Sequence, residues 1–531
     1  MTASTDAPGG ALPKQKLRQS FLYHAALCCN ERMLNPVERA EAQPENPFTS
    51  FIKHQHYAII PHFTLESGVV LHNVPVAYTT SGQLSSNGEN VLVVCHALSG
   101  SADVKDWWGP LIGRRGRAFD TTRFFVVCLN SLGSPYGSAS PVTSINGDPQ
   151  LGRYGPDFPL TTIRDDVNIH KLVLDDLGVR RIAAIIGGSM GGMLVLEYAY
   201  FGKDYVRSIV PIATSSQHSA WGISWGEAQR QSIYCDPKYE DGYYPYDDPP
   251  SAGLGAARMS ALLTYRSRDS FEVRFGRNTP DPSKKQVIND NHRPSTPTSE
   301  HWAVHNDGHR STRTTSPSMN GSTAPNAPAN AIVSLSNADP TQFTDPQFHG
   351  ATTLSTSPPS VPQAIRKRAT TYFSAQSYLR YQGNKFVQRF DSNCYIAISR
   401  KLDTHDVSRH RVSADEEHPT AKALSLIEQP ALVIGIESDG LFTWSEQQEI
   451  AAGIPNSRLR NIDSPEGHDA FLLQFEQVNK HILEFFDEVL PDIMSLPGLC
   501  EDGGDDAPGT VSLRERTSTF GEDEVGDITA W

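Results

Sequence analysis

The sequence has no hydrophobic run of the ~20 residues that span a lipid bilayer, and no apolar N-terminal segment resembles a signal peptide. Its seven cysteines include no CxxC pair and no Cys/His spacing typical of zinc, so we predict no metal site. Basic residues are in the minority, 46 against 60 acidic ones, which gives a net charge of −14. These absences argue against membrane and nucleic-acid partners, and they favour a soluble, cytoplasmic protein.

Secondary-structure periodicity indicates one α/β domain built from two parts of the 531-residue chain. Residues 51–215 alternate short apolar runs, such as Val91–Cys95, with helical patterns, which is typical of a mostly parallel sheet with flanking helices. The same alternation returns in residues 429–492. We therefore predict that the two segments form a single sheet with crossover helices.

The remaining segments are predicted to lie outside that sheet. Residues 216–428 have helical patterns with aromatic residues, and we interpret them as an inserted helical lid. Within the lid, residues 279–370 are rich in Pro, Ser, Thr and Asn and poor in large apolar groups, so we predict a disordered insertion. Residues 1–50 read as an N-terminal extension, and the acidic, Gly-rich residues 497–531 as a disordered tail.

A glycine-rich turn in the first sheet segment carries the candidate nucleophile. The apolar run Arg181–Ile186 is followed by the turn Gly187–Gly192 (GGSMGG) and then by helical spacing from Met193 to Tyr200. Strand, Gly-x-Ser-x-Gly turn and helix together form the context of a nucleophile elbow, in which glycine neighbours leave room for a strained serine. We therefore predict that Ser189 is the nucleophile.

A serine hydroxyl needs a histidine to remove its proton and an acid to orient that histidine. His468 lies in a Gly-flanked loop after the last predicted strand, and Asp439 follows the strand before it. Asp403 and Asp406 are rival acids, but they precede that strand and fall in the predicted lid. The order Ser189, Asp439, His468 is that of the α/β-hydrolase fold.

Backbone N–H groups would form the oxyanion hole. One is predicted to come from Met190, directly after the serine, and the second from Leu98, in the small-residue loop that follows the strand Val91–Cys95. Up to this point the residues predict acyl transfer through a serine ester and leave the acceptor open.

Five motifs together resemble one family. They are His96–Gly100 (HALSG), Asn130–Pro141 (NSLGSPYGSASP), Gly187–Gly192 (GGSMGG), Gly253–Tyr265 (GLGAARMSALLTY) and Gly467–Asp469 (GHD). The combination resembles the homoserine O-acetyltransferases, and most closely their fungal members, over residues of about 50–275 and 371–490. The departures from shorter members are the 279–370 insertion and the two tails.

This resemblance implies a ping-pong reaction without a bound cofactor, with acetyl-CoA and L-homoserine as small-molecule substrates, in methionine biosynthesis. It implies that Arg258, on a lid helix, binds the amino-acid carboxylate, with Tyr265 two helical turns further on. It also implies that Asp469 binds the substrate ammonium. A fixed cation and a fixed anion suit a zwitterionic substrate. The family further suggests a homodimer.

Other functions stay open at this point. Related acyltransferases use succinyl-CoA, or they acetylate serine or the hydroxyl of an antibiotic precursor. A plain esterase or lipase would have the same triad, and transfer exceeds hydrolysis only if the lid keeps water from the acyl-enzyme. A non-catalytic scaffold that kept the fold is disfavoured by the intact set of three triad candidates.

Overall fold

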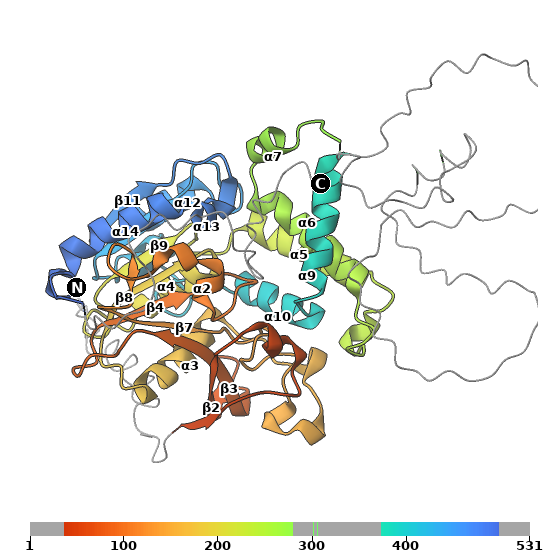
Figure 1. Ribbon diagram of the computed structural model, residues 1–531, viewed down its shortest axis with the longest axis horizontal. Helices are drawn as coiled ribbons and strands as arrows, with labels where there is room; N and C mark the ends of the chain where they lie inside the picture. Colours follow the sequence, from red (N-terminus) through yellow and green to blue (C-terminus); the bar gives the residue numbers. More distant parts are fainter. Residues whose placement is uncertain (1–36, 280–300, 302–304, 306–372, 499–531) are drawn as a thin grey trace, which may run out of the picture.

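The computed structural model describes residues 37–279, 301, 305 and 373–498 (Figure 1). The predicted extension 1–50 is therefore described only from residue 37. The predicted insertion 279–370 and the predicted tail 497–531 lie almost wholly outside the described residues. None of the helices in the described part of the chain is long and apolar enough to cross a membrane.

A nine-stranded sheet forms the centre of the described molecule, with the order β1-β2-β3-β7-β4-β8-β9-β10-β11. The strands from β7 to β11 pair in parallel, whereas β1, β2 and β3 join them as an antiparallel edge. The predicted mostly parallel sheet is thus confirmed. The strands are β1 Glu38–Ala40, β2 His56–Thr64, β3 Val70–Ser81, β4 Val91–Cys95, β7 Phe125–Leu129, β8 Ile182–Gly188, β9 Ile209–Ile212, β10 Ala431–Gly435 and β11 Ser457–Asn461, with β5 Ile112–Gly113 and β6 Phe119–Asp120 in a separate pair.

Both faces of the sheet are covered by helices, which explains why the central strands are apolar at every position. Along β4, Val91, Val93 and Cys95 join one core cluster, and Leu92 and Val94 join the other. The first cluster includes residues of α3 (Ile163–Asp176), α4 (Met190–Ala199) and α12 (Trp444–Gly453). The second includes residues of α14 (Phe475–Val489), and Figure 1 shows α3 and α14 on opposite sides of the sheet.

A group of helices lies beside the sheet in Figure 1, and we call it the lid. It consists of α5 Ala220–Tyr234, α6 Ser251–Tyr265, α7 Arg268–Arg274, α9 Ser374–Val387 and α10 Ser392–Asp403. α6 packs between α5 and α9, and α10 packs against α5. α11 (Pro419–Leu424), within the predicted lid range 216–428, packs instead against α12 at the sheet.

The other short helices connect these elements. They are α2 Val104–Trp107, α13 Ala470–Leu473, α15 Pro491–Met494, η1 Pro47–Phe51, η2 Gly109–Leu111, η3 Ile145–Gly147, η4 Pro149–Leu151, η5 Gly155–Asp157, η6 Glu240–Gly242 and η9 Gly467–Asp469.

Two elements differ from the sequence prediction. Helical spacing in the sequence predicts a single helix from Ala470 to Val489, but the structure breaks it at Gln474, where φ is −95° and ψ is 54°. The indole N–H of Trp108 donates to the carbonyl of Phe471 at 3.1 Å and so takes an acceptor that an unbroken helix would use. The edge strand β1, inside the predicted extension, was not expected, because three residues carry no periodic signal.

Candidate active site

Ser189 joins β8 to α4 and has a backbone conformation that serine seldom adopts, with φ 59° and ψ −125°. Such a conformation costs about 1–3 kcal/mol and persists only where the surroundings hold it. Here the Ser189 N–H donates to the Ile212 carbonyl at 3.0 Å. The Ser189 carbonyl accepts from the Thr214 hydroxyl at 2.7 Å and from the Gly192 N–H at 2.9 Å. Strand β9 and the loop after it therefore fix the elbow.

The glycines around Ser189 are required by close approach of neighbouring atoms. A Cβ at Gly191 would lie 2.2 Å from the Cys95 carbonyl oxygen, and one at Gly187 would lie 2.5 Å from the Gly191 backbone. A Cβ at Gly188 would lie 2.4 Å from the Phe471 ring. The turn therefore packs directly against the end of β4 and against α13.

His468 and Asp439 form a buried pair. The His468 Nδ1 lies 2.7 Å from Asp439 Oδ2, and both residues are less than 5 % exposed. The other carboxylate oxygen of Asp439 accepts from the N–H groups of Leu441 and Phe442 at 2.8 and 3.0 Å. Because Nδ1 donates to a carboxylate, the neutral ring has its lone pair on Nε2, which is the state that a general base requires.

The rings around His468 link it to the elbow. The Phe471 ring, which fills the space beside Gly188, has its centroid 5.4 Å from that of His468. The centroids of the Phe442 and Tyr265 rings lie 5.4 and 6.1 Å from that of His468. The elbow and the His–Asp pair, which come from distant parts of the sequence, therefore border the same phenylalanine ring.

The two rival acids have other partners. Asp403 Oδ2 lies 2.8 Å from the Arg230 guanidinium. Asp406 Oδ1 accepts from the N–H and the hydroxyl of Ser408 at 2.7 and 2.6 Å. In the described part of the chain, the carboxylate bonded to His468 is that of Asp439.

The two predicted oxyanion donors lie at the same end of neighbouring strands. Met190 is the first residue of α4, so the helix cannot satisfy its N–H. Leu98 lies in the loop after β4, and β4 pairs in parallel with β8, with Cys95 opposite Gly187. Both loops therefore leave the same edge of the sheet, where Ser189 is.

His96 holds the Leu98 loop in place, a role that the sequence pattern did not reveal. Its Nδ1 contacts the Ala97 carbonyl at 2.8 Å, and its Nε2 accepts the Ser131 N–H at 3.0 Å. Complete burial lowers the pKa of His96 to about 4. A neutral ring that donates from Nδ1 and accepts at Nε2 satisfies both contacts.

A buried ion pair ties the lid to the loop after β7. Lys401, on α10, lies 2.5 Å from Asp166 Oδ2 and 2.6 Å from the Leu132 carbonyl, and both charged side chains are 0 % exposed. Asp166 Oδ1 accepts the Leu132 N–H at 2.8 Å. Asp166 lies in the first turn of α3, where the sequence alone indicates only a favourable charge at a helix N-terminus.

Arg258 is buried on α6 and lies close to the rings around His468. Its guanidinium carbon is 5.3 Å from the centroid of the Tyr265 ring and 4.7 Å from that of Phe386. The Tyr265 ring in turn lies 6.1 Å from His468. The predicted carboxylate-binding arginine is therefore separated from the candidate base by one aromatic ring.

Asp469 is also buried, but a cation is already beside it. Its Oδ2 lies 2.9 Å from Arg266 Nε, and both side chains are 3 % exposed. A second acid, Glu466, contacts Arg266 Nη1 at 2.7 Å. A substrate ammonium at Asp469 would therefore share this carboxylate with Arg266, which the sequence reading did not foresee. Among the described residues, no cluster of His, Cys, Asp or Glu is arranged to hold a metal ion.

Comparison with known proteins gives the following relatives. Residues 90–312 match the family model described as the alpha/beta hydrolase fold. The chain is 67% identical over 498 residues to the homoserine O-acetyltransferase of Emericella nidulans, covering 93% of this chain and 98% of that protein.

Two solved structures agree in fold. Homoserine O-acetyltransferase from Bacillus anthracis aligns with a TM-score of 0.57 at 19% identity, covering 82% of this chain and 97% of that chain. Esterase E22 aligns with a TM-score of 0.58 at 21% identity, covering 81% and 99%. These likenesses confirm the predicted α/β-hydrolase fold.

Proposed function

The chain belongs to the homoserine O-acetyltransferases, and from that premise we propose that it transfers an acetyl group from acetyl-CoA to the side-chain hydroxyl of L-homoserine. The products are CoA and O-acetyl-L-homoserine, an intermediate of methionine biosynthesis. No bound cofactor is needed, because a serine ester carries the acetyl group between the two substrates. We place the enzyme in the cytoplasm and propose that it is a homodimer.

In the first half-reaction, Ser189 Oγ attacks the thioester carbonyl of acetyl-CoA while His468 Nε2 takes its proton. Asp439, 2.7 Å from Nδ1, stabilises the imidazolium that forms. The N–H groups of Met190 and Leu98 bind the developing oxyanion, where each donor typically contributes about 10²–10³ in rate. The C–S bond then breaks, and the CoA sulfur leaves with the proton from His468.

In the second half-reaction, the homoserine hydroxyl takes the place of CoA. His468 removes its proton, the oxygen attacks the acetyl carbonyl, and the Ser189 ester bond breaks as Oγ regains a proton. Arg258 binds the substrate carboxylate through two parallel N–H bonds, and Asp469 binds the ammonium. Arg266 Nε, 2.9 Å from Asp469 Oδ2, would lie beside the bound ammonium.

The single observation that carries this mechanism is the buried 2.7 Å contact between His468 and Asp439 beside a serine held at a φ of 59°. An esterase uses the same arrangement, and the likeness to esterase E22 concerns the fold alone. Succinyl-CoA as the donor and serine or an antibiotic precursor as the acceptor are the remaining alternatives.

Mass spectrometry after incubation with acetyl-CoA alone tests the donor and the nucleophile together. We expect a mass gain of one acetyl group on the peptide that contains Ser189, and no gain in Ser189→Ala or with succinyl-CoA. CoA release is then measured with and without L-homoserine. Release that is indifferent to homoserine would support an esterase and contradict the transferase.

A further inference from the structure

A buried arginine from the lid contacts the loop that carries Leu98. Arg389 lies between α9 and α10 and is 5 % exposed. Its Nη1 donates to the Ser99 carbonyl at 3.2 Å, one residue after Leu98. The two residues are 290 positions apart in the chain, so no motif or local pattern reveals the contact. The proposed catalytic set does not include Arg389.

Hydrogen bonds within the loop connect this contact to the Leu98 N–H. The Ser99 carbonyl and the Gly100 N–H belong to one peptide group, and that N–H donates to the Ala97 carbonyl at 3.0 Å. The Ala97 carbonyl belongs to the same peptide group as the Leu98 N–H. Because a peptide group is planar, holding its carbonyl also sets the direction of its N–H. Arg389 therefore acts on the Leu98 N–H through two peptide groups.

This chain of hydrogen bonds starts at a positive charge. Arginine stays protonated in proteins, and a hydrogen bond from an ionised donor is roughly twice as strong as one between neutral groups. Hydrogen bonds in a row also polarise one another. The guanidinium of Arg389 therefore makes the Leu98 N–H a stronger donor, at the place where the oxyanion of acyl transfer develops.

Other contacts hold the Arg389 side chain in this position. The buried Tyr136 hydroxyl accepts from Arg389 Nη1 at 3.0 Å and donates to the Arg389 carbonyl at 2.8 Å. The guanidinium carbon lies 5.0 Å from the centroid of the Phe386 ring, on α9. The same ring lies 4.7 Å from the guanidinium carbon of Arg258. One lid side chain thus supports both Arg389 and the proposed carboxylate anchor.

We propose that Arg389 is a positioning residue for the oxyanion hole. It holds the Ser99–Gly100 peptide group so that the Leu98 N–H points at the reacting carbonyl, and it acts through the loop rather than on the substrate. This inference rests on the oxyanion role proposed for Leu98. The loop belongs to the sheet segment, whereas the group that holds it belongs to the lid, so acylation of Ser189 depends on a correctly packed lid.

Pre-steady-state acylation by p-nitrophenyl acetate tests the proposal. This ester needs neither CoA nor homoserine, so the result does not depend on which donor and acceptor the enzyme uses naturally. Acetylation of Ser189 releases a burst of p-nitrophenolate, and Ser189→Ala gives the baseline without it. The rate constant of the burst measures the chemical step, and its amplitude counts the correctly folded active sites.

Arg389→Met removes the guanidinium but keeps an unbranched apolar side chain beside Phe386. We expect the burst rate constant at saturating ester to fall about 10- to 100-fold, because one of the two oxyanion donors is then misplaced. The ester concentration that gives half of the maximal rate should stay close to that of the wild type. The burst amplitude should also be unchanged, since the active sites that fold are still counted.

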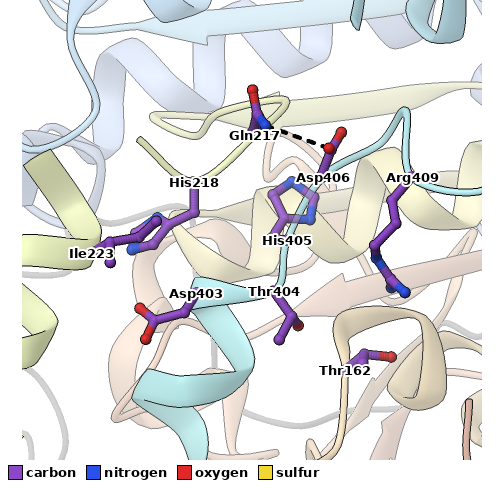
Figure 2. A pocket seen from close by; sticks show the side chains of 9 residues that line it. All are labelled: Thr162, Gln217, His218, Ile223, Asp403, Thr404, His405, Asp406 and Arg409. Carbon is purple, nitrogen blue, oxygen red and sulfur yellow. Dashed lines mark hydrogen bonds between the residues drawn. The ribbon is translucent and has the colours of Figure 1, made fainter. Parts of the chain in front are cut away.

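Arg230→Met is the matched control, because Arg230 is also a lid arginine and is 2 % exposed. It pairs with Asp403 at 2.8 Å. Asp403 lines a separate hollow of about 420 Å³, shown in Figure 2, and none of the residues around this hollow belongs to the proposed catalytic set. Arg230→Met should therefore keep the burst rate constant of the wild type.

Any of three results would overturn the proposal. One is an unchanged burst rate constant in Arg389→Met. Another is a loss confined to the burst amplitude, which would mean that Arg389 only stabilises the fold. The third is an equal fall in the rate constant of Arg230→Met, which would assign the effect to the lid as a whole.

Discussion

Substituting Gly188 by alanine should damage catalysis through Phe471 rather than through the elbow itself. The new Cβ would lie 2.4, 2.5 and 2.9 Å from three carbon atoms of the Phe471 ring, whereas non-bonded carbons normally lie ~3.5–4.0 Å apart. The backbone of Gly188 is not in the left-handed region, so an alanine is compatible with its conformation. The ring must therefore move by about 1 Å.

We expect movement of the Phe471 ring to lower both the stability of the protein and its kcat. Overpacking of this size typically destabilises a protein by about 1–3 kcal/mol. The Phe471 ring lies 5.4 Å from His468 and 6.0 Å from Trp108, so it cannot move without pushing one of them. A 1 Å misplacement of a catalytic group can cost about 10²-fold in rate, and we expect a loss in kcat of that order.

The assay is steady-state CoA release, with unfolding by urea as the measure of stability. Phe471→Leu in the Gly188→Ala background removes the ring atoms that the methyl group meets, and should restore part of kcat. Gly187→Ala is the matched control, because its Cβ would meet the Gly191 backbone at 2.5 Å and no side-chain change relieves that contact. Wild-type turnover by Gly188→Ala, or equal rescue of both glycine variants by Phe471→Leu, would refute this reasoning.

Four further outcomes follow from the site and its supports. Asp439→Asn should lower kcat by about 10⁴-fold with the fold intact by circular dichroism, because an amide cannot stabilise the His468 imidazolium; retained turnover would exclude Asp439. Arg258→Ala should raise the KM for homoserine by about 10- to 100-fold and far more than that for acetyl-CoA, and equal effects would contradict a carboxylate role. Lys401→Met should cost about 3–5 kcal/mol of unfolding free energy, because Asp166 stays buried without its cation, and Lys401→Met with Asp166→Asn should recover part of it. Burial raises the pKa of Glu197, but the charges and hydrogen bonds of Arg411 and Arg164 outweigh burial and lower this pKa to about 2. The ionised carboxylate therefore stabilises the fold above pH 4.5, and that stabilisation is lost as the pH falls toward 2. The stability difference between the wild type and Glu197→Gln, on the order of 3 kcal/mol at neutral pH, should therefore shrink over that acidic range, and a constant difference would contradict the assignment.

The sequence predicted those parts of the fold that leave a pattern among residues close together in the chain. The strands β4 and β8 are apolar at nearly every position because both faces of the sheet are covered, and that pattern is visible without a structure. The elbow was also predictable, because four glycines around one serine have few other uses. Asp439 and His468 could be chosen by their order along the chain, and the structure pairs them.

The features that the sequence did not reveal depend on partners far along the chain. The break at Gln474 follows from a hydrogen bond between residues 363 positions apart. Lys401 and Asp166 are separated by 235 positions, and neither is unusual in its local context. The contact between Asp469 and Arg266 likewise joins the loop after β11 to the end of α6. Periodicity and motifs carry no information about such pairs, because the packing of the whole chain creates them.

The pairing of β9 with β10 has a consequence for synthesis of the protein. These adjacent strands are separated by about 220 residues in the chain, so β9 emerges from the ribosome long before its neighbour. At about 5–20 residues per second, β9 presents an open edge for about 10–40 s. An apolar edge of this kind is a template for pairing with other chains, so we expect the nascent protein to be prone to aggregation while its lid is being translated.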